Sequence, residues 1–226
     1  MSDCALIVMA KAPVPGFAKT RLATALGADG AARLAERLLE STIEKAVASR
    51  IGPVTLCCDP DATHHAFARL ASLHPIELAV QGDGDLGLRM HRALERAMRT
   101  HRRAVLIGTD TPGIDATFLR AAARALLDHD AVFGPAVDGG YTLVGVSGNA
   151  PALLFAGIDW STARVMQQTR AQLVRLGLEH VELPTLPDVD EPADLVHVPS
   201  GWLGPPAPAQ PAAEGHAGAP FPWRPR

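Results

Sequence analysis

Short apolar runs alternate with amphipathic helical patterns through the first 130 residues of the chain. The runs CALIVMA, PVTLCC, IELAV and AVLIG begin at residues 4, 53, 76 and 104. Between them, apolar residues recur at the spacing of one helix face, as in Met90, Leu94 and Met98. Strands that alternate with helices in this way form βαβ units, so the pattern predicts an α/β fold with a mainly parallel sheet.

The segment AVFGPAVDGGYTLVGV (131–146) interrupts this alternation. Its two β-rich runs flank Gly139 and Gly140, which favours an antiparallel hairpin. A further helix is expected to start near Ser161 or Thr162, and LEHVEL (178–183) reads as a last strand. The segment DVDEPADL (188–195) is typical of a final capped turn or helix, with Asp190 as its N-cap.

A chain of 226 residues is long enough for one sizeable core. We expect one domain over residues 1–198 and a disordered tail over 199–226, because the tail is rich in Pro, Ala and Gly and lacks periodicity. A net charge of −3 argues against nucleic-acid or membrane-surface partners. No run has the length of a membrane span, and the N-terminus lacks a basic signal-peptide region, so a cytoplasmic location is expected.

The loop KAPVPGFAKTRL (11–22) follows the first apolar run and ends in Lys-Thr-Arg. A P-loop ending at Lys19 would need glycine at positions 13 and 18, where this chain has Pro13 and Ala18. The loop instead offers side-chain cations beside one glycine. They are expected to bind phosphate, with ordinary solvated loop cations as the alternative; the residues are Lys11, Gly16, Lys19 and Arg21.

Two further loops follow strands that would end at the same sheet edge. Asp110, in GTDTPG, comes directly after an apolar strand, where a carboxylate is costly unless it is hydrogen-bonded, solvated or bound to a cation. We expect it to hold Mg²⁺ or Mn²⁺, with an Asx-turn as the alternative. In QGDGDLGLRM, Asp85 could contact a ligand or cap the next helix, and Arg89 could reach a phosphate or base or face solvent.

The segment DGGY (138–141) could form a second part of the site. Asp138 and Tyr141 could hydrogen-bond a sugar or acceptor, and Gly139 and Gly140 would line that substrate site, although a hairpin turn alone explains both glycines. Asp188 could complete a metal site with Asp110, or could only shape its turn.

Other chemistries lack their motifs in this sequence. There is no H-E-x-x-H and no G-x-S-x-G, and Gly16 stands alone where a dinucleotide fingerprint would need three glycines. The three cysteines have no C-x-x-C spacing and are expected to be core residues in a reducing compartment; they are Cys4, Cys57 and Cys58.

Taken together, the motifs resemble a bacterial family of GT-A-type, nucleotide-diphospho-sugar-transferase-like proteins, which includes proteins labelled arsenosugar-biosynthesis glycosyltransferases. The resemblance covers residues 4–196 and rests on MAKAPVPGFAKTRL, GDLGLRM, GTDTPGI, GPAVDGGYTLVGV, DWST and DVDEPADL. It implies a Rossmann-like α/β/α sandwich and a nucleotide at the carboxyl edge of the first strands. It also implies a divalent ion on the carboxylate after the central strand, which here is Asp110.

The chain is more distantly similar to small nucleotidyltransferases such as the phospholactate guanylyltransferases. Their Lys, Pro, Lys, Thr, Arg and Leu after the first strand correspond here to Lys11, Pro13, Lys19, Thr20, Arg21 and Leu22. Their closing D-x-D-x-P-x-D-L matches residues 188–195. TDTP, however, is not the D-x-D motif usual in glycosyltransferases.

The sequence thus predicts a metal-dependent transferase that uses a nucleotide-diphospho-sugar and a small-molecule acceptor. Lys19 and Asp138 are the candidate catalytic residues, with Asp138 as general base. The first alternative is a nucleotidyltransferase that couples an NTP to a phosphorylated small acid or sugar and releases pyrophosphate. The second is a nucleotide-binding module without catalytic activity.

Overall fold

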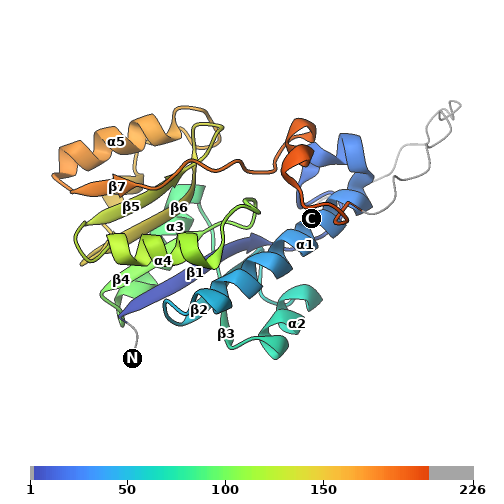
Figure 1. The fold of residues 1–226 in the computed structure, drawn as a ribbon, viewed down its shortest axis with the longest axis horizontal. Helices are drawn as coiled ribbons and strands as arrows, with labels where there is room; N and C mark the ends of the chain where they lie inside the picture. The colour runs from blue at the N-terminus through green and yellow to red at the C-terminus, as the bar shows by residue number, and fades with distance from the viewer. Residues whose placement is uncertain (1–2, 204–226) are drawn as a thin grey trace, which may run out of the picture.

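The computed structural model describes residues 3–203. Their seven strands form one sheet in the order β3-β2-β1-β4-β6-β5-β7 (Figure 1). Only β6 among these runs antiparallel to its neighbours. The strands are β1 (Cys4–Lys11), β2 (Val54–Asp59), β3 (Ile76–Val80), β4 (Arg103–Ile107), β5 (Ala131–Pro135), β6 (Tyr141–Ser147) and β7 (His180–Glu182). The predicted α/β fold and the hairpin of β5 and β6 are confirmed.

Helices cover both faces of the sheet. One face packs against α1 (Ala23–Ser49), α2 (His65–Leu73) and α4 (Ala116–Ala125), and the other against α3 (Leu86–Met98) and α5 (Val165–Leu176) (Figure 1). Alternate strand residues face opposite layers, so Leu6 lies in the first core and Ile7 in the second. Cys57 and Cys58 are likewise buried in opposite layers as free thiols.

A third apolar cluster joins the C-terminal part of the described chain to η1 and the first half of α1. Val189, Val198 and Trp202 pack against Leu22 and the first half of α1. The short 3₁₀ helices η1 (Thr20–Leu22) and η3 (Pro192–His197) therefore lie side by side (Figure 1), while η2 (Ala152–Phe155) packs near α3 and α5. This contact brings DVDEPADL to the loop after β1.

Two boundaries differ from the expectations from sequence. Helix α5 begins at Val165, later than expected, because Ser161 has a left-handed φ of 63° and residues 161–164 form turns. Trp202, in the predicted tail, packs on the third cluster, and residues 204–226 of that tail lie outside the described part. Within residues 3–203, no helix is both long and apolar enough to cross a membrane.

Candidate active site

A pocket of about 710 Å³ lies over the carboxyl ends of β1 and β4. We call it the main pocket, and its volume is in the range typical of sites for small ligands. It gathers segments far apart in sequence: the loops after β1, β3 and β4, the β5–β6 turn, and residues 160–165 and 188–190. Of the site residues expected from sequence, all but Gly16 and Gly139 line it, namely Lys11, Lys19, Arg21, Asp85, Arg89, Asp110, Asp138, Gly140, Tyr141 and Asp188.

Lys19 is held by three acceptors from two distant segments. Its Nζ lies 2.5 Å from Oδ1 of Asp110 and 2.7 Å from Oδ1 of Asp190, and it donates to the backbone oxygen of Val189 at 2.7 Å. An ammonium has three hydrogens to donate, so all its hydrogen bonds are used. Burial alone would lower the pKa of Lys19, but Asp110 and Asp190 outweigh it and raise that pKa, so the side chain is a charged, fixed centre.

The structure corrects the expected role of Asp190. Glu191, not Asp190, precedes η3, and Oδ2 of Asp194 accepts hydrogen bonds from the backbone N–H groups of Asp190 and Glu191 at 3.0 and 2.7 Å. The carboxylate of Asp190 is therefore turned toward Lys19 and caps no helix.

Asp110 is more accessible than its position after an apolar strand suggested, because 44% of its side chain is exposed in the pocket. Its loop is fixed from two sides. The backbone N–H of Val189 donates to the backbone oxygen of Asp110 at 2.9 Å, and Nζ of Lys45 donates to the backbone oxygen of Pro112 at 2.8 Å. The carboxylate pairs with Lys19, which favours a role in the site over the Asx-turn alternative.

The two other cations of the loop after β1 are less constrained. Lys11 lies 5.8 Å from the ring centroid of Phe17, and Arg21 lies 3.9 Å from Glu191 with 62% of its side chain exposed. Both can reorient toward an anion at low cost. Gly16 adopts a φ of 77° that favours glycine, and it shapes the loop from outside the pocket lining.

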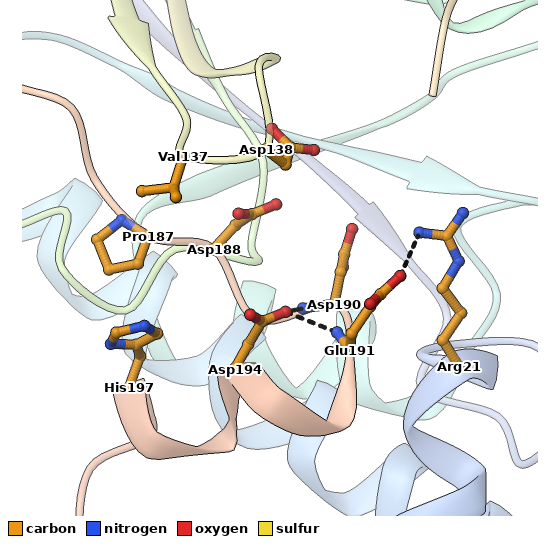
Figure 2. Close-up of a pocket in the computed structure, with 9 residues that line it drawn as sticks. All are labelled: Arg21, Val137, Asp138, Pro187, Asp188, Asp190, Glu191, Asp194 and His197. Carbon is orange, nitrogen blue, oxygen red and sulfur yellow. Dashed lines mark hydrogen bonds and ion pairs between the residues drawn. The ribbon is translucent and has the colours of Figure 1, made fainter. Parts of the chain in front are cut away.

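Figure 2 shows the residues that line a smaller pocket of about 270 Å³, which we call the acidic pocket. It adjoins the main pocket because the two share lining residues. The shared residues are Arg21, Asp138, Asp188 and Asp190. Partial burial, together with the nearby Asp138, Asp190 and Asp110, raises the pKa of Asp188 to about 6. The sheet and the C-terminal segment thus concentrate negative charge beside Lys19.

The carboxylates of Asp110 and Asp188 are the hard oxygen ligands that Mg²⁺ and Mn²⁺ accept. Within residues 3–203, no group of three or more His, Cys, Asp or Glu side chains is arranged to hold a metal ion. An ion here would need further oxygens from a phosphate or water, which is common for Mg²⁺. The donor set therefore fits an ion that binds together with a phosphorylated substrate, and the metal stays a prediction.

The DGGY turn is built mainly for packing. Oδ1 of Asp138 accepts from the N–H of Gly140 at 2.8 Å, and the oxygen of Gly139 accepts from the N–H of Met166 at 2.9 Å. Gly139 has a φ of 90°, and a Cβ there would lie 2.3 Å from the backbone oxygen of Ala163. Gly139 is thus required where the turn meets the start of α5, and its expected place in a substrate site is not supported by the pocket lining.

Tyr141 lines the main pocket, but its ring packs in the core and its hydroxyl is buried. Its ring stacks edge-on against Phe133 and Trp160, at centroid distances of 5.1 and 6.3 Å. Its hydroxyl is buried and has no hydrogen-bond partner within the described residues, and the nearby Thr169 hydroxyl donates its hydrogen to the backbone oxygen of Val165. The expected hydrogen bond from the Tyr141 hydroxyl to a sugar or acceptor is therefore not available in this conformation.

The start of α3 forms another wall. Asp85 caps the helix by accepting from the N–H of Leu88 at 2.8 Å, as the alternative proposed. Arg89 pairs with Asp59 at 3.2 Å and donates Nε to the oxygen of Gly84 at 2.9 Å. Ligand roles for Asp85 and Arg89 stay predictions, although both line the main pocket.

Sequence reasoning missed Gln81 and Arg92. Gln81 follows β3, is only 6% exposed and lines the main pocket. Arg92 donates to the backbone oxygens of Gln81 and Asp83 at 2.5 and 2.9 Å and so fixes the loop after β3. The one available signal was an uncharged polar residue at the end of the apolar run IELAV.

Comparisons with known proteins agree with this architecture. Residues 42–162 match the profile of a family described as "Uncharacterized protein conserved in bacteria (DUF2064)". A structure from Desulfovibrio desulfuricans G20, described as a candidate nucleotide-diphospho-sugar transferase, is 32% identical. It covers 89% of this chain and 90% of its own, with a TM-score of 0.80. No curated protein matches the sequence significantly.

Two more distant structures share the fold alone. A 4-diphosphocytidyl-2C-methyl-D-erythritol synthase from Anaerococcus prevotii is 9% identical and covers 85% of this chain and 94% of its own, with a TM-score of 0.59. A cytidylyltransferase from Leptospira borgpetersenii is 12% identical and covers 81% and 76%, with a TM-score of 0.52. The predicted resemblance to nucleotide-diphospho-sugar-transferase-like proteins and the α/β/α fold are thus confirmed.

Proposed function

The chain belongs to the DUF2064 family, and we propose that it is a transferase that takes a nucleotide-diphospho-sugar donor and transfers the sugar to a small-molecule acceptor. The observation that carries this proposal is the fixed ammonium of Lys19, paired with Asp110 at the carboxyl edge of the sheet in a pocket of about 710 Å³. Ligands of open parallel sheets bind at this edge. The relative at 32% identity, described as a candidate nucleotide-diphospho-sugar transferase, supports the donor class.

The cations of the loop after β1 suit a diphosphate leaving group. Lys19 is fixed and charged, while Arg21 and Lys11 are free to reorient. Sugar transfer leaves negative charge on the departing nucleoside diphosphate, and fixed positive charge beside that position lowers the barrier. We assign this role to Lys19, with Arg21 and Lys11 as phosphate contacts.

A divalent ion would be held by Asp110 and Asp188 and would neutralise part of the diphosphate charge when bound. Asp138 lines both pockets, so it can face the acceptor, and we assign it the role of taking the acceptor's proton. A general base must lie within hydrogen-bond reach of the proton it removes, which places the acceptor hydroxyl beside the β5–β6 turn.

Calorimetric titration with the glucose conjugates of UDP, GDP, ADP, CDP and dTDP, with Mg²⁺ or Mn²⁺ present, tests the proposal. We expect at least one donor to bind with a Kd in the micromolar range, and Asp110→Asn to weaken it about tenfold or more. Asp128→Asn is the matched control, because Asp128 is exposed after α4 and outside both pockets. A protein that binds none of these conjugates contradicts the proposal.

A second candidate is nucleotidyl transfer, in which an acceptor phosphate attacks the α-phosphorus of an NTP and pyrophosphate leaves. The favouring observation is that TDTP offers the single carboxylate of Asp110 where a D-x-D pair has two, while the cations after β1 suit a triphosphate equally. The structure of 12% identity that shares the fold is described as a cytidylyltransferase, and the one of 9% identity as a 4-diphosphocytidyl-2C-methyl-D-erythritol synthase. Binding of one NTP in preference to every diphospho-sugar, with pyrophosphate release, would favour this candidate.

A further inference from the structure

Gln81 occupies an unusual position over the ends of three strands. It follows β3, its backbone N–H donates to the oxygen of Cys58 in β2 at 3.0 Å, and it is only 6% exposed. Buried amide side chains are costly unless their polar atoms are satisfied. Each polar atom of this amide therefore needs a hydrogen-bond partner.

Both hydrogens of the Gln81 amide nitrogen are used. Nε2 donates to the backbone oxygen of Ala10 in β1 at 3.2 Å and to that of Cys57 in β2 at 3.0 Å. Backbone oxygens only accept hydrogen bonds, so the nitrogen must face them. The amide cannot turn over without losing both bonds, which locks its orientation.

The amide oxygen is the remaining atom, and it has no hydrogen-bond donor among residues 3–203. The buried side-chain polar atom that lacks a partner in this part of the chain is the Tyr141 hydroxyl. Oε1 of Gln81 is thus neither paired nor sealed in the core, and Gln81 lines the main pocket. A nine-tenths buried side chain therefore presents one fixed acceptor to the pocket.

The surroundings suit the base end of a nucleotide. Met9, Leu86 and Met90 line the same pocket and offer apolar contact to a flat ring. Arg92 binds the backbone oxygens of Gln81 and Asp83, and Arg89 binds that of Gly84, so the loop is rigid. Lys19 pairs with Asp110 at the end of β4, which lies on the other side of β1 from Gln81. If the phosphates of a donor bind beside Lys19, its base lies over β2 and β3. One to two strand spacings, about 5 to 10 Å, then separate the phosphates from the base.

We propose that Gln81 determines which base the donor carries, by accepting a hydrogen bond at Oε1 from an N–H group on the base edge. This inference rests on the proposed use of a nucleotide donor. Because the amide is locked, it reads a donor only, and a base that presents an oxygen or an unprotonated nitrogen there leaves two acceptors facing each other. Gln81 is thus a specificity-determining residue of the main pocket.

The proposal predicts selectivity between bases of the same ring size. Cytosine has an amino group where uracil has an oxygen, and guanine has a ring N–H where adenine has a lone pair. An unpaired buried acceptor weakens binding about ten- to a hundredfold. The preferred donor should therefore bind at least about tenfold more tightly than the donor whose base has the same ring size but presents an acceptor at that position. We call this second donor the partner donor, and its base the partner base.

The test measures Kd for the five glucose conjugates with the wild type, Gln81→Met and the control Glu77→Gln, which alters an exposed residue of β3. We expect Gln81→Met to weaken the preferred donor about tenfold and to leave the partner base within about twofold, which removes the selectivity. Glu77→Gln should behave as wild type. If Gln81→Met weakens every donor by the same factor, Gln81 only supports the strands and the proposal is overturned.

A wild-type measurement avoids reliance on folding of the variant. The preferred donor, methylated at the N–H groups of its base edge, should bind wild-type protein at least about tenfold more weakly than the unmethylated donor. Equal binding overturns the proposal. A wild type that binds all five donors equally overturns it and leaves the proposed function intact, whereas one that binds none overturns both.

Discussion

The ammonium of Lys19 lies 2.5 Å from Oδ1 of Asp110, and this pair connects the loop after β1 to the loop after β4 at the centre of the sheet. Asp190 completes the arrangement from the C-terminal segment at 2.7 Å. The Lys19 side chain is 7% exposed, whereas the two carboxylates are 44% and 41% exposed. The cation is therefore buried and fixed, while both carboxylates remain accessible to a ligand.

Replacement of Lys19 by methionine should depress turnover far more than donor binding. A fixed charge that acts on the leaving group stabilises the transition state more than the ground state. We expect kcat to fall by about a hundredfold or more and Kd for the donor to change by less than about tenfold. Arg99→Met, which removes an exposed cation at the end of α3, is the control. A weaker Kd with an unchanged kcat would show that Lys19 only binds the donor, and equal losses in both would also contradict the assignment.

Asp110 and Asp190 both contact Lys19, but they should respond differently to metal. We assign Asp110 to a divalent ion and Asp190 to the support of Lys19. Donor affinity should therefore rise with Mg²⁺ in wild type and in Asp190→Asn, and be insensitive to Mg²⁺ and to EDTA in Asp110→Asn. Titration of donor with and without EDTA measures this. Loss of the Mg²⁺ effect in Asp190→Asn alone would reverse the two assignments.

The fold and half of the site follow from short-range patterns in the sequence. Short apolar runs that alternate with helical patterns mark the strands, and parallel strands end at one edge, so the loop with Lys19 and the loop with Asp110 were expected to lie at the same edge. The partner role of Asp190 was not readable. It depends on Val189, Val198 and Trp202 packing against Leu22 and α1, a contact that no local pattern encodes.

Tyr141 shows a different limit. Along β5 and β6 the register pairs Gly134 with Leu143 but Pro135 with Tyr141, so β6 carries one extra residue at its start. A one-residue shift turns a side chain to the opposite face of a sheet. The shift places the Tyr141 ring in the core beside Phe133, and no repeat in the sequence signals it.

Substitution of Gly139 by alanine should destabilise the protein strongly. The new Cβ would lie 2.3 Å from the backbone oxygen of Ala163, and the φ of 90° is unfavourable for any residue with a Cβ. We expect the free energy of unfolding to fall by about 2–4 kcal/mol in urea denaturation.

Gly140→Ala is the matched control for this substitution. Its Cβ would meet only the side chain of Asp138, at 3.1 Å, and that side chain can move. The loss there should stay below about 1 kcal/mol. Similar losses at both positions would show that the turn tolerates neither residue for a reason other than the contact with Ala163.

His64 should make the stability of α2 depend on pH. It is the N-cap of α2, and its Nδ1 accepts from the N–H of Ala66 at 3.2 Å. Burial, and then the neighbouring His65, lower its pKa below the usual value. The neutral ring is therefore favoured in the folded state, so the cap contributes fully above about pH 6.5 and is lost as pH falls through the folded pKa. A protonated ring has no lone pair with which to accept.

His64→Asn tests this dependence, because asparagine caps a helix without titrating. On acidification from about pH 8 to pH 5, wild type should lose about 0.5–1 kcal/mol of unfolding free energy relative to the variant. The contributions of the other titrating groups cancel in this difference, because wild type and variant share those groups. Urea denaturation followed by circular dichroism at both pH values measures the difference. A constant difference across this range would mean that the capping bond at Nδ1 adds no stability, since its loss on protonation would then have no effect.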